Sequence, residues 1–90
     1  MHTAYMEFDP AKAASNLEKH GIDFADAEPV LYDERAYTTD KVVSGELRHI
    51  TTGTDALGRV ITVVWTMRGK TPRLISARAA RRKEKQFYEA

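Results

Sequence analysis

The 90-residue chain contains no cysteine, which excludes disulfide bonds, thiolate nucleophiles and zinc held by cysteine. No apolar run approaches the roughly 20 residues that a membrane-spanning helix needs. The N-terminal segment MHTAYMEFDP has early acidic residues and lacks the apolar stretch of a signal peptide. These absences predict a cytoplasmic protein that has no membrane partner.

The signatures of several common enzyme classes are also missing. The chain has no G-x-S-x-G, no Walker loop and no dinucleotide-binding G-x-G-x-x-G. Its three histidines, His2, His20 and His49, include no pair at the helical i, i+4 spacing. We therefore expect no metal site and no cofactor.

The composition indicates one soluble domain, which we assign to residues 1–90. Hydrophobic residues make up 42% of the chain and charged residues 30%. The net charge of +1 conceals an asymmetry, because eight basic and two acidic residues follow position 67, for a net charge of +6. The preceding residues carry six basic and eleven acidic side chains, for a net charge of −5. The basic C-terminal third indicates a polyanionic partner, an acidic protein partner or simply a solvated basic helix.

Helix signals mark three segments. A capping aspartate, a proline at the first helical position and a glycine stop at Gly21 predict a helix over residues 10–19. A second helix is predicted over residues 24–31, which Pro29 would limit or kink. Residues 79–89, rich in Arg, Lys, Glu and Ala, predict a C-terminal helix.

Between these helices, the sequence pattern predicts an antiparallel sheet. A short strand is expected at residues 36–38, and further strands over residues 46–52, 59–67 and 73–78. The nearly continuous apolar character of residues 59–67 is typical of a central strand. The expected fold class is α+β, with N-terminal helices packed on a twisted antiparallel β-sheet and a C-terminal helix.

The two faces of the central strand differ in polarity. One face is apolar and should pack on the helices, whereas the other mixes valine with threonine and should be more open. The apolar face consists of Ile61, Val63, Trp65 and Met67, and the mixed face of Val60, Thr62, Val64 and Thr66.

After these exclusions, arginine is the residue type left in the sequence that can take part in chemistry. Arg48, Arg68 and Arg78 each lie in or at the end of a predicted strand. If Arg48 and Arg78 share the mixed face, they can flank a phosphate, which a guanidinium binds with two parallel hydrogen bonds. RNA can be cleaved without a metal when a base takes the 2′-hydroxyl proton and cations stabilise the charged phosphate. The alternative for each arginine is a surface salt bridge.

Four segments, in order along the chain, resemble the BrnT toxin family. The first, FDPAKAASNLEKHGIDFADA, is similar to the family's (F/W)-D-P-x-K helix and its K-H-G-(I/V)-x-F corner. SGELRHITTG resembles the G-E-x-R strand, and GRVITVVWTMRG resembles the G-R-x-(L/I)-x-V-V-x-T-x-R hairpin. PRLISARAARRKEKQFYE resembles the R-(I/L)-I-S-A-R-x-A-x-x-x-E-x-x-x-Y ending. Residues 1–7 lie outside the resemblance, and Met6 is an alternative start to Met1.

The resemblance implies a type II toxin–antitoxin toxin with a RelE-like fold. Such a toxin is a metal-independent endoribonuclease that cleaves RNA and inhibits translation. Its implied partner is a BrnA-type antitoxin of the ribbon-helix-helix type. The complex would contact operator DNA only through this antitoxin. Trp65, Phe87 and Tyr88 are possible apolar anchors for that partner, with core packing as the alternative for Trp65.

By motif match, the resemblance implies six candidate catalytic residues. They are Lys19, His20, Glu46, Arg48, Arg68 and Arg78, and the basic tail adds the RNA-binding candidates Arg81, Arg82, Lys83 and Lys85. His20 lies at a helix end. It is either a helix cap or a residue that contacts a base or a phosphate of RNA. His49, where the family commonly has an apolar or aromatic residue, is a packing variant or an added proton donor. Two other functions stay open, a non-catalytic RNA- or partner-binding domain and a folded but inactive toxin.

Overall fold

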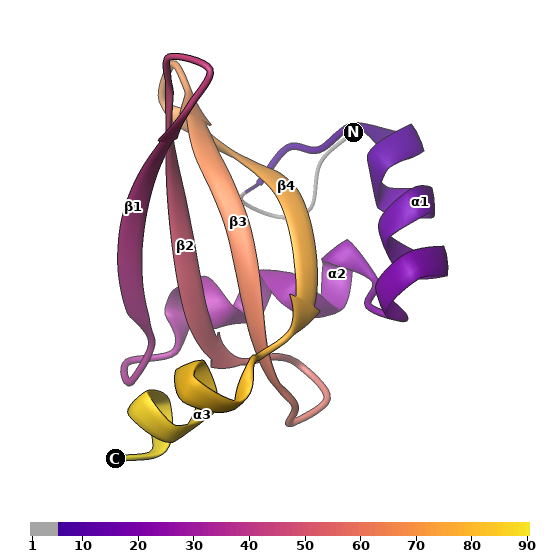
Figure 1. Ribbon diagram of the computed structural model, residues 1–90. Coiled ribbons are helices and arrows are strands. Elements are labelled where there is room, and N and C mark those ends of the chain that lie inside the picture. Colours follow the sequence, from indigo (N-terminus) through magenta and orange to yellow (C-terminus); the bar gives the residue numbers. More distant parts are fainter. Residues whose placement is uncertain (1–5) are drawn as a thin grey trace.

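The computed structural model describes residues 6–90, in which four antiparallel strands form one sheet in the order β1-β2-β3-β4 (Figure 1). The elements are α1 (Pro10–His20), α2 (Phe24–Ala27), the 3-10 helix η1 (Glu28–Tyr32), β1 (Tyr37–Val43), β2 (Glu46–Thr54), β3 (Val60–Arg68), β4 (Thr71–Ala79) and α3 (Arg82–Glu89). The predicted α+β class and the central position of β3 are confirmed. His2 lies outside the described residues. Within residues 6–90, the helices are too short or too polar to cross a membrane.

Helix α1 forms as the sequence predicts and extends one residue further. The Asp9 carboxylate accepts a hydrogen bond from the Ala11 N–H at 2.9 Å, and Pro10 occupies the first turn. Gly21 adopts the left-handed conformation, with φ of 67°, and its N–H donates to the Leu17 carbonyl. Both ends of the helix are therefore satisfied by local signals.

A buried amide joins α1 to β4, which is an edge strand (Figure 1). The Asn16 Nδ2 donates to the carbonyl oxygens of Ile22 at 3.1 Å and Ala77 at 2.9 Å. The Asn16 Oδ1 accepts from the Ala77 N–H at 3.0 Å. Asn16 thus satisfies main-chain groups that would otherwise need another strand.

The prediction of a single helix over residues 24–31 is wrong beyond Ala27. Asp23 caps α2 through its side chain, but the chain then continues as the 3-10 helix η1. Pro29 has no N–H to donate to the carbonyl four residues earlier, so the α-helical ladder stops. Phe24 and Ala27 are nevertheless buried, and the predicted apolar stripe still packs on the core.

Strand β1 is longer than the predicted strand at residues 36–38, and that prediction was too short. The five central residues of β1 are exposed, so the strand shows no apolar alternation. Its pairing is set by the turn at Ser44 and Gly45, whose φ angles of 51° and 78° suit a two-residue hairpin. The other strands and α3 match their predicted ranges to within three residues.

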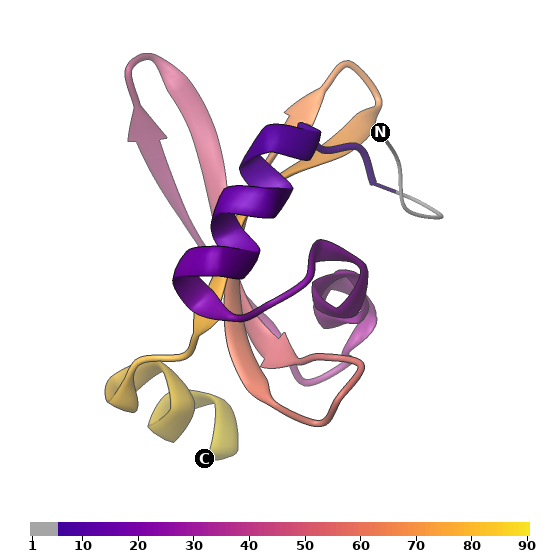
Figure 2. The same cartoon turned by 90° about the vertical axis from the view of Figure 1, so that its right-hand side faces the viewer.

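One face of the sheet, which we call the helix face, packs against α2 and η1, while α1 lies along the β4 edge (Figure 1 and Figure 2). Ile61 and Val63 are buried there, as predicted. Trp65 is partly buried against the core, whereas Met67, at the hairpin end, is 45% exposed, so the apolar face is covered only in part. The core consists of Met6, Ile22, Phe24, Ala27, Val30, Ile61, Val63, Leu74 and Ala77.

The opposite face, which we call the open face, is crossed at one end by α3. Figure 2 shows α2 and α3 on opposite sides of the sheet. The Glu84 carboxylate of α3 accepts hydrogen bonds from both terminal nitrogens of Arg78, at 2.7 and 3.0 Å, and from the Thr62 hydroxyl at 3.1 Å. Thr62, which the mixed pattern predicts to be more open, is fully buried beneath this contact.

Further polar contacts hold α3 against the sheet. The Tyr88 hydroxyl donates to the Asp33 carboxylate and lies 2.7 Å from the Thr54 hydroxyl. The hydrogen bond from Tyr88 lowers the pKa of Asp33. The Tyr37 hydroxyl donates to the Glu84 carbonyl at 3.1 Å. None of the residues of α3 is buried, so its position depends on these hydrogen bonds and on the Phe87 ring, whose centroid lies 4.6 Å from that of the Tyr37 ring.

We predict that Asn16→Ala lowers the free energy of unfolding by about 2–4 kcal/mol. The substitution leaves the Ala77 N–H and two carbonyl groups without their partner in a buried position. Glu18→Ala, on the exposed side of the same helix, is the control and should change stability by less than about 0.5 kcal/mol. Urea denaturation measures both. Equal stability of the two variants would contradict the role assigned to Asn16.

We also predict an acid-sensitive contact at Glu84. The hydrogen bonds from Arg78 are the largest cause that lowers the pKa of Glu84 from its usual 4.5 to about 2. Because the folded-state pKa lies below the unfolded one, the stabilisation is complete above about pH 4.5 and is lost as the pH falls toward 2. Glu84→Gln should therefore unfold more readily at neutral pH and lose less stability between pH 5 and 3 than the wild type. Urea titrations across this range test the prediction, with the exposed Glu89→Gln as control. A Glu84→Gln variant with the wild-type pH dependence would refute it.

Candidate functional site

The strand register places one row of side chains across the middle of the open face. Thr39 lies opposite Ile50, Ile50 opposite Val64, and Val64 opposite Ser76. Ile50, Val64 and Ser76 are half-buried, so the row forms an accessible floor that is apolar at its centre and polar at both ends. Three groups of polar and charged side chains surround this floor.

The first group contains three of the six predicted catalytic residues. The Glu46 carboxylate contacts Arg48 Nε at 3.2 Å and Arg68 Nη2 at 3.8 Å. Arg48 also lines a pocket of about 190 Å³ together with Lys41, Val43, Ile50 and Val64. One carboxylate and three cationic side chains thus lie at one end of the open face.

The second group lies at the other end, around Arg78. The register pairs Arg78 with Thr62 of β3. Arg48 faces Thr66 of the same strand, four residues further along. With strand spacings of about 4.8 Å and rises of about 3.3 Å, the Cα atoms of Arg48 and Arg78 are roughly 16 Å apart. The two arginines share the mixed face, but at this separation they do not flank one phosphate, contrary to expectation, because Arg78 is held by Glu84 and lies away from the Glu46 group.

Glu84 is a site residue that the sequence reasoning missed. It is the N3 residue of α3, and its carboxylate accepts the Arg81 N–H at 2.8 Å, as in a capping box. An acidic residue three positions after a helix start is a recognisable signal for this role. Its second role, fixing Arg78, depends on tertiary packing that no spacing reveals.

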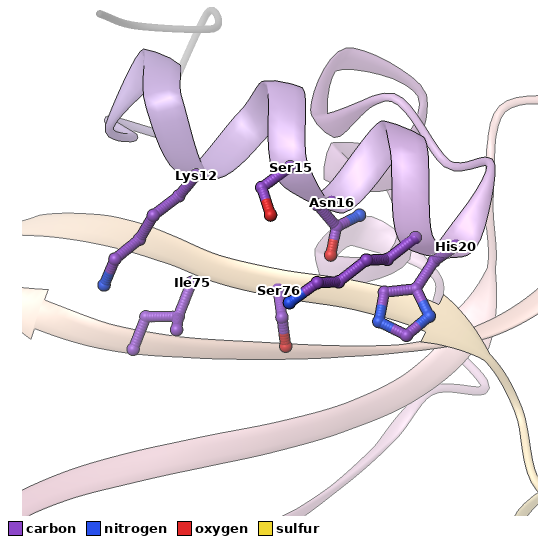
Figure 3. Close-up of a pocket in the computed structure, with 7 residues that line it drawn as sticks. Lys12, Ser15, Asn16, His20, Ile75 and Ser76 are labelled. Atoms are coloured by element: carbon purple, nitrogen blue, oxygen red, sulfur yellow. The ribbon is translucent and has the colours of Figure 1, made fainter.

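The third group contains the predicted residues Lys19 and His20. They come from the last turn of α1 and line a pocket of about 170 Å³ between this helix and β4 (Figure 3). The other lining residues are Lys12, Ser15, Asn16, Ile75 and Ser76. Ser76 also ends the row across the open face, so this pocket adjoins that face at the β4 edge.

The basic residues of α3 extend the cationic surface. Arg81, Arg82, Lys83 and Lys85 are all exposed. Lys83 lines a cleft with Tyr37, Thr38, Thr39, Glu84 and Phe87, and the Phe87 ring is 67% exposed. The cleft combines an exposed aromatic ring with a cation.

His49 lies on the helix face, opposite the arginines of the open face. Its Nδ1 is 2.7 Å from the Asp40 carboxylate, and its ring centroid is 4.4 Å from that of Trp65. Trp65 in turn donates a hydrogen bond to the Thr51 hydroxyl at 2.9 Å. This placement favours the packing interpretation of His49 over that of a proton donor for the open face.

Chemically, the open face combines guanidinium groups with a carboxylate near an accessible floor. Guanidinium groups bind phosphate oxygens, and a carboxylate accepts a proton. Within residues 6–90, no three His, Asp or Glu side chains gather as they would around a metal ion. The residues present therefore suit a phosphate-containing ligand that spans several cationic groups.

Comparison with known proteins identifies the family of this chain. A family model described as the ribonuclease toxin BrnT of type II toxin–antitoxin systems matches residues 8–84. The fold is similar to that of the Brucella abortus ribonuclease toxin BrnT in a 1.1 Å crystal structure, with 26% sequence identity and a TM-score of 0.64. The similarity covers 89% of this chain and 100% of that one. A search of curated proteins finds no match. The chain therefore belongs to the BrnT family of ribonuclease toxins of type II toxin–antitoxin systems.

Proposed function

We propose that the protein is a metal-independent endoribonuclease that cleaves RNA on the open face and thereby inhibits translation. The observation that supports this most directly is the contact of one carboxylate, Glu46, with the two guanidinium groups of Arg48 and Arg68. This group provides a proton acceptor beside fixed cations, which are the two requirements of metal-free RNA cleavage.

In the proposed reaction, Glu46 takes the proton of a ribose 2′-hydroxyl, and the oxygen attacks the adjacent phosphorus. Arg48 and Arg68 stabilise the negative charge that develops on the phosphate oxygens. The bond to the 5′-oxygen then breaks, and water protonates the leaving oxygen. The products are a 2′,3′-cyclic phosphate and a 5′-hydroxyl end, so the step needs no oxidant and no cofactor.

The other predicted residues would hold the RNA strand. Arg78, fixed by Glu84, would contact a phosphate further along the open face, and Lys19 and His20 would contact the strand at the β4 edge. The exposed cations of α3 would attract RNA through the charge of its backbone, an interaction that weakens with salt. These cations are Arg81, Arg82, Lys83 and Lys85.

One observation favours the alternative of a non-catalytic RNA- or partner-binding domain. Arg48 and Arg78 are both paired with carboxylates, as arginines in purely structural salt bridges are. In that case RNA would bind the basic surface without being cut.

As a type II toxin, the protein has an antitoxin partner, and we propose that this partner is a BrnA-type protein with a ribbon-helix-helix-type domain. The antitoxin would supply the contact with operator DNA and cover part of the basic surface of α3. Phe87 supports this location, because it is a large exposed aromatic ring among basic residues. Trp65, packed against the core, and Tyr88, bonded to Thr54, are less available as anchors.

We predict that Arg48→Ala and Glu46→Gln each reduce RNA cleavage at least about 100-fold and abolish growth arrest. Glu46→Gln should keep most of the RNA affinity, since the amide still accepts a hydrogen bond but takes no proton. Arg35→Ala, which removes an exposed arginine of the segment between η1 and β1, is the matched control. Cleavage is measured in buffer with EDTA on folded, purified variants. Full activity of either variant, or inhibition of the wild type by EDTA, would disprove the proposed reaction.

We further predict that the antitoxin and RNA compete for the toxin. Phe87→Ala should weaken antitoxin binding about tenfold or more, because exposed aromatic anchors dominate interfaces. Gln86→Ala, its exposed neighbour, is the control. Fluorescence anisotropy of a labelled RNA oligonucleotide, titrated with antitoxin, measures the competition. If toxin binds both at full affinity, the antitoxin neutralises it without covering the basic surface.

A further inference from the structure

Helix α1 turns a polar and basic stripe toward the sheet edge. Its residues follow the spacing i, i+3, i+4, i+7 and i+8, which in a surface helix normally carries the apolar residues that face the core. In α1 these positions are Lys12, Ser15, Asn16, Lys19 and His20, and all of them line the pocket beside β4 (Figure 3). Asn16 explains how the helix is attached to β4, but the other four residues have no such structural role.

The strand on the other side of the pocket is distorted at the same place. The pairing of β3 with β4 shifts between Val64 and Trp65, so that Ile75 is the extra residue of a β-bulge. A bulge re-aims the side chains next to it. Here both Ile75 and Ser76 line the pocket, and Figure 3 shows Ser76 on the strand below the helix that carries Ser15 and Lys12, with its hydroxyl directed away from that helix.

The electrostatics of the pocket distinguish it from the rest of the cationic surface. Among residues 6–90, no carboxylate forms an ion pair with Lys12, Lys19 or His20, and no acidic side chain lines the pocket. The arginines of the open face, in contrast, have carboxylate partners at 2.7 to 3.8 Å. The pocket therefore holds positive charge that the described protein does not neutralise.

Lys12 also occupies a position where a cation destabilises the helix. It lies in the first turn of α1, which contains no acidic residue, and the helix dipole disfavours a cation at this end. An acidic residue there would stabilise the helix. The lysine is better explained by a ligand that needs its charge.

We propose that this pocket binds a backbone phosphate of the RNA substrate, a few nucleotides from the phosphate that reacts at Arg48. This inference rests on the proposed ribonuclease function and adds Lys12, Ser15 and Ser76 to the RNA-binding surface. The ammonium groups of Lys12 and Lys19 neutralise the phosphate, and the two serine hydroxyls donate hydrogen bonds to its oxygens.

The position of the pocket supports an RNA phosphate over an isolated anion. Ser76 lies opposite Val64, and Val64 lines the pocket that contains Arg48. From Ser76 to Ile50 the distance is two strand spacings, about 10 Å. A single RNA strand that crosses the sheet along this row therefore reaches both pockets, with its bases over the apolar centre.

The test is the binding of a single-stranded RNA oligonucleotide with 2′-O-methyl groups on every ribose, which prevents the cleavage reaction and permits equilibrium titration. The variants are Lys12→Ala, Lys12→Glu and Lys12→Arg. The matched control is Lys70→Ala, which removes an exposed lysine in the β3–β4 turn, outside the pockets described. Fluorescence anisotropy at several salt concentrations gives the Kd and its salt dependence, and thermal unfolding reports stability.

We expect Lys12→Ala to raise the Kd about five- to tenfold and to reduce the slope of log Kd against log salt by about 0.7, the loss of one phosphate contact. Lys12→Glu should bind more weakly still while its Tm stays the same or rises, because the glutamate suits the helix dipole. Lys12→Arg should keep near wild-type affinity, and Lys70→Ala should keep the wild-type slope.

Two results would overturn the inference. One is a Lys12→Ala variant whose affinity and salt slope equal those of Lys70→Ala. The other is a Lys12→Ala variant that loses affinity for the antitoxin and not for RNA, which would make the pocket a protein-binding site. Failure of the proposed function gives a different result, since the wild type would then not cleave unmodified RNA, whether or not it binds the methylated oligonucleotide.

Discussion

The attachment of α1 to the edge of the sheet through Asn16 is the contact on which most of the architecture depends. Among residues 6–90, the core has nine buried apolar residues, and α1 contributes none of them. A helix without a buried apolar stripe cannot be held by the hydrophobic effect alone. The three hydrogen bonds of Asn16 supplement the packing of the partly buried Ala13. Two of them satisfy the main chain of Ala77 at the edge of β4, where Glu7 pairs with the strand further along. Because α1 is fixed in this way, its remaining polar side chains are free to line a pocket.

The open face follows the same principle, since polar contacts hold α3 against it. Glu84 binds Arg78 and Thr62, and Tyr88 binds Asp33 and Thr54. These contacts place the basic helix α3 over one end of the face and leave the Glu46 group accessible at the other. Hydrogen-bonded contacts of this kind fix geometry more sharply than apolar contacts, which tolerate sliding. A surface that must present cations at fixed spacings benefits from such contacts.

The parts of the fold that sequence patterns predict are those with local signals. The caps of α1 at Asp9 and Gly21 and the continuous apolar strand β3 depend on neighbouring residues, and both form as expected. Strand β1 was underestimated because an exposed edge strand needs no alternation. The helix over residues 24–31 was overestimated because the missing N–H of Pro29 outweighs the apolar spacing.

The candidate site was predictable only in part for the same physical reason. Motif matches select Glu46, Arg48 and Arg68, and these residues do lie together, because they come from the neighbouring strands β2 and β3. The motif matches do not reveal that Arg78 pairs with Glu84, since that contact requires α3 to fold back on the sheet. Similarly, the pocket beside β4 joins residues about 60 positions apart in the chain, such as Lys12 and Ser76, through a bulge that no pattern shows.

The sequential order of the strands has a consequence for folding during synthesis on the ribosome. Three hairpin pairings join neighbouring strands and can form as the chain emerges, since they close only short loops. The bonds between Asn16 and Ala77 close a loop of 61 residues and must wait until the last strand is made. Arg78 and Glu84 follow it within a few positions. A nascent chain therefore acquires its complete cationic face only after residues 77–84 have been made, whereas its first hairpin can pair well before that point.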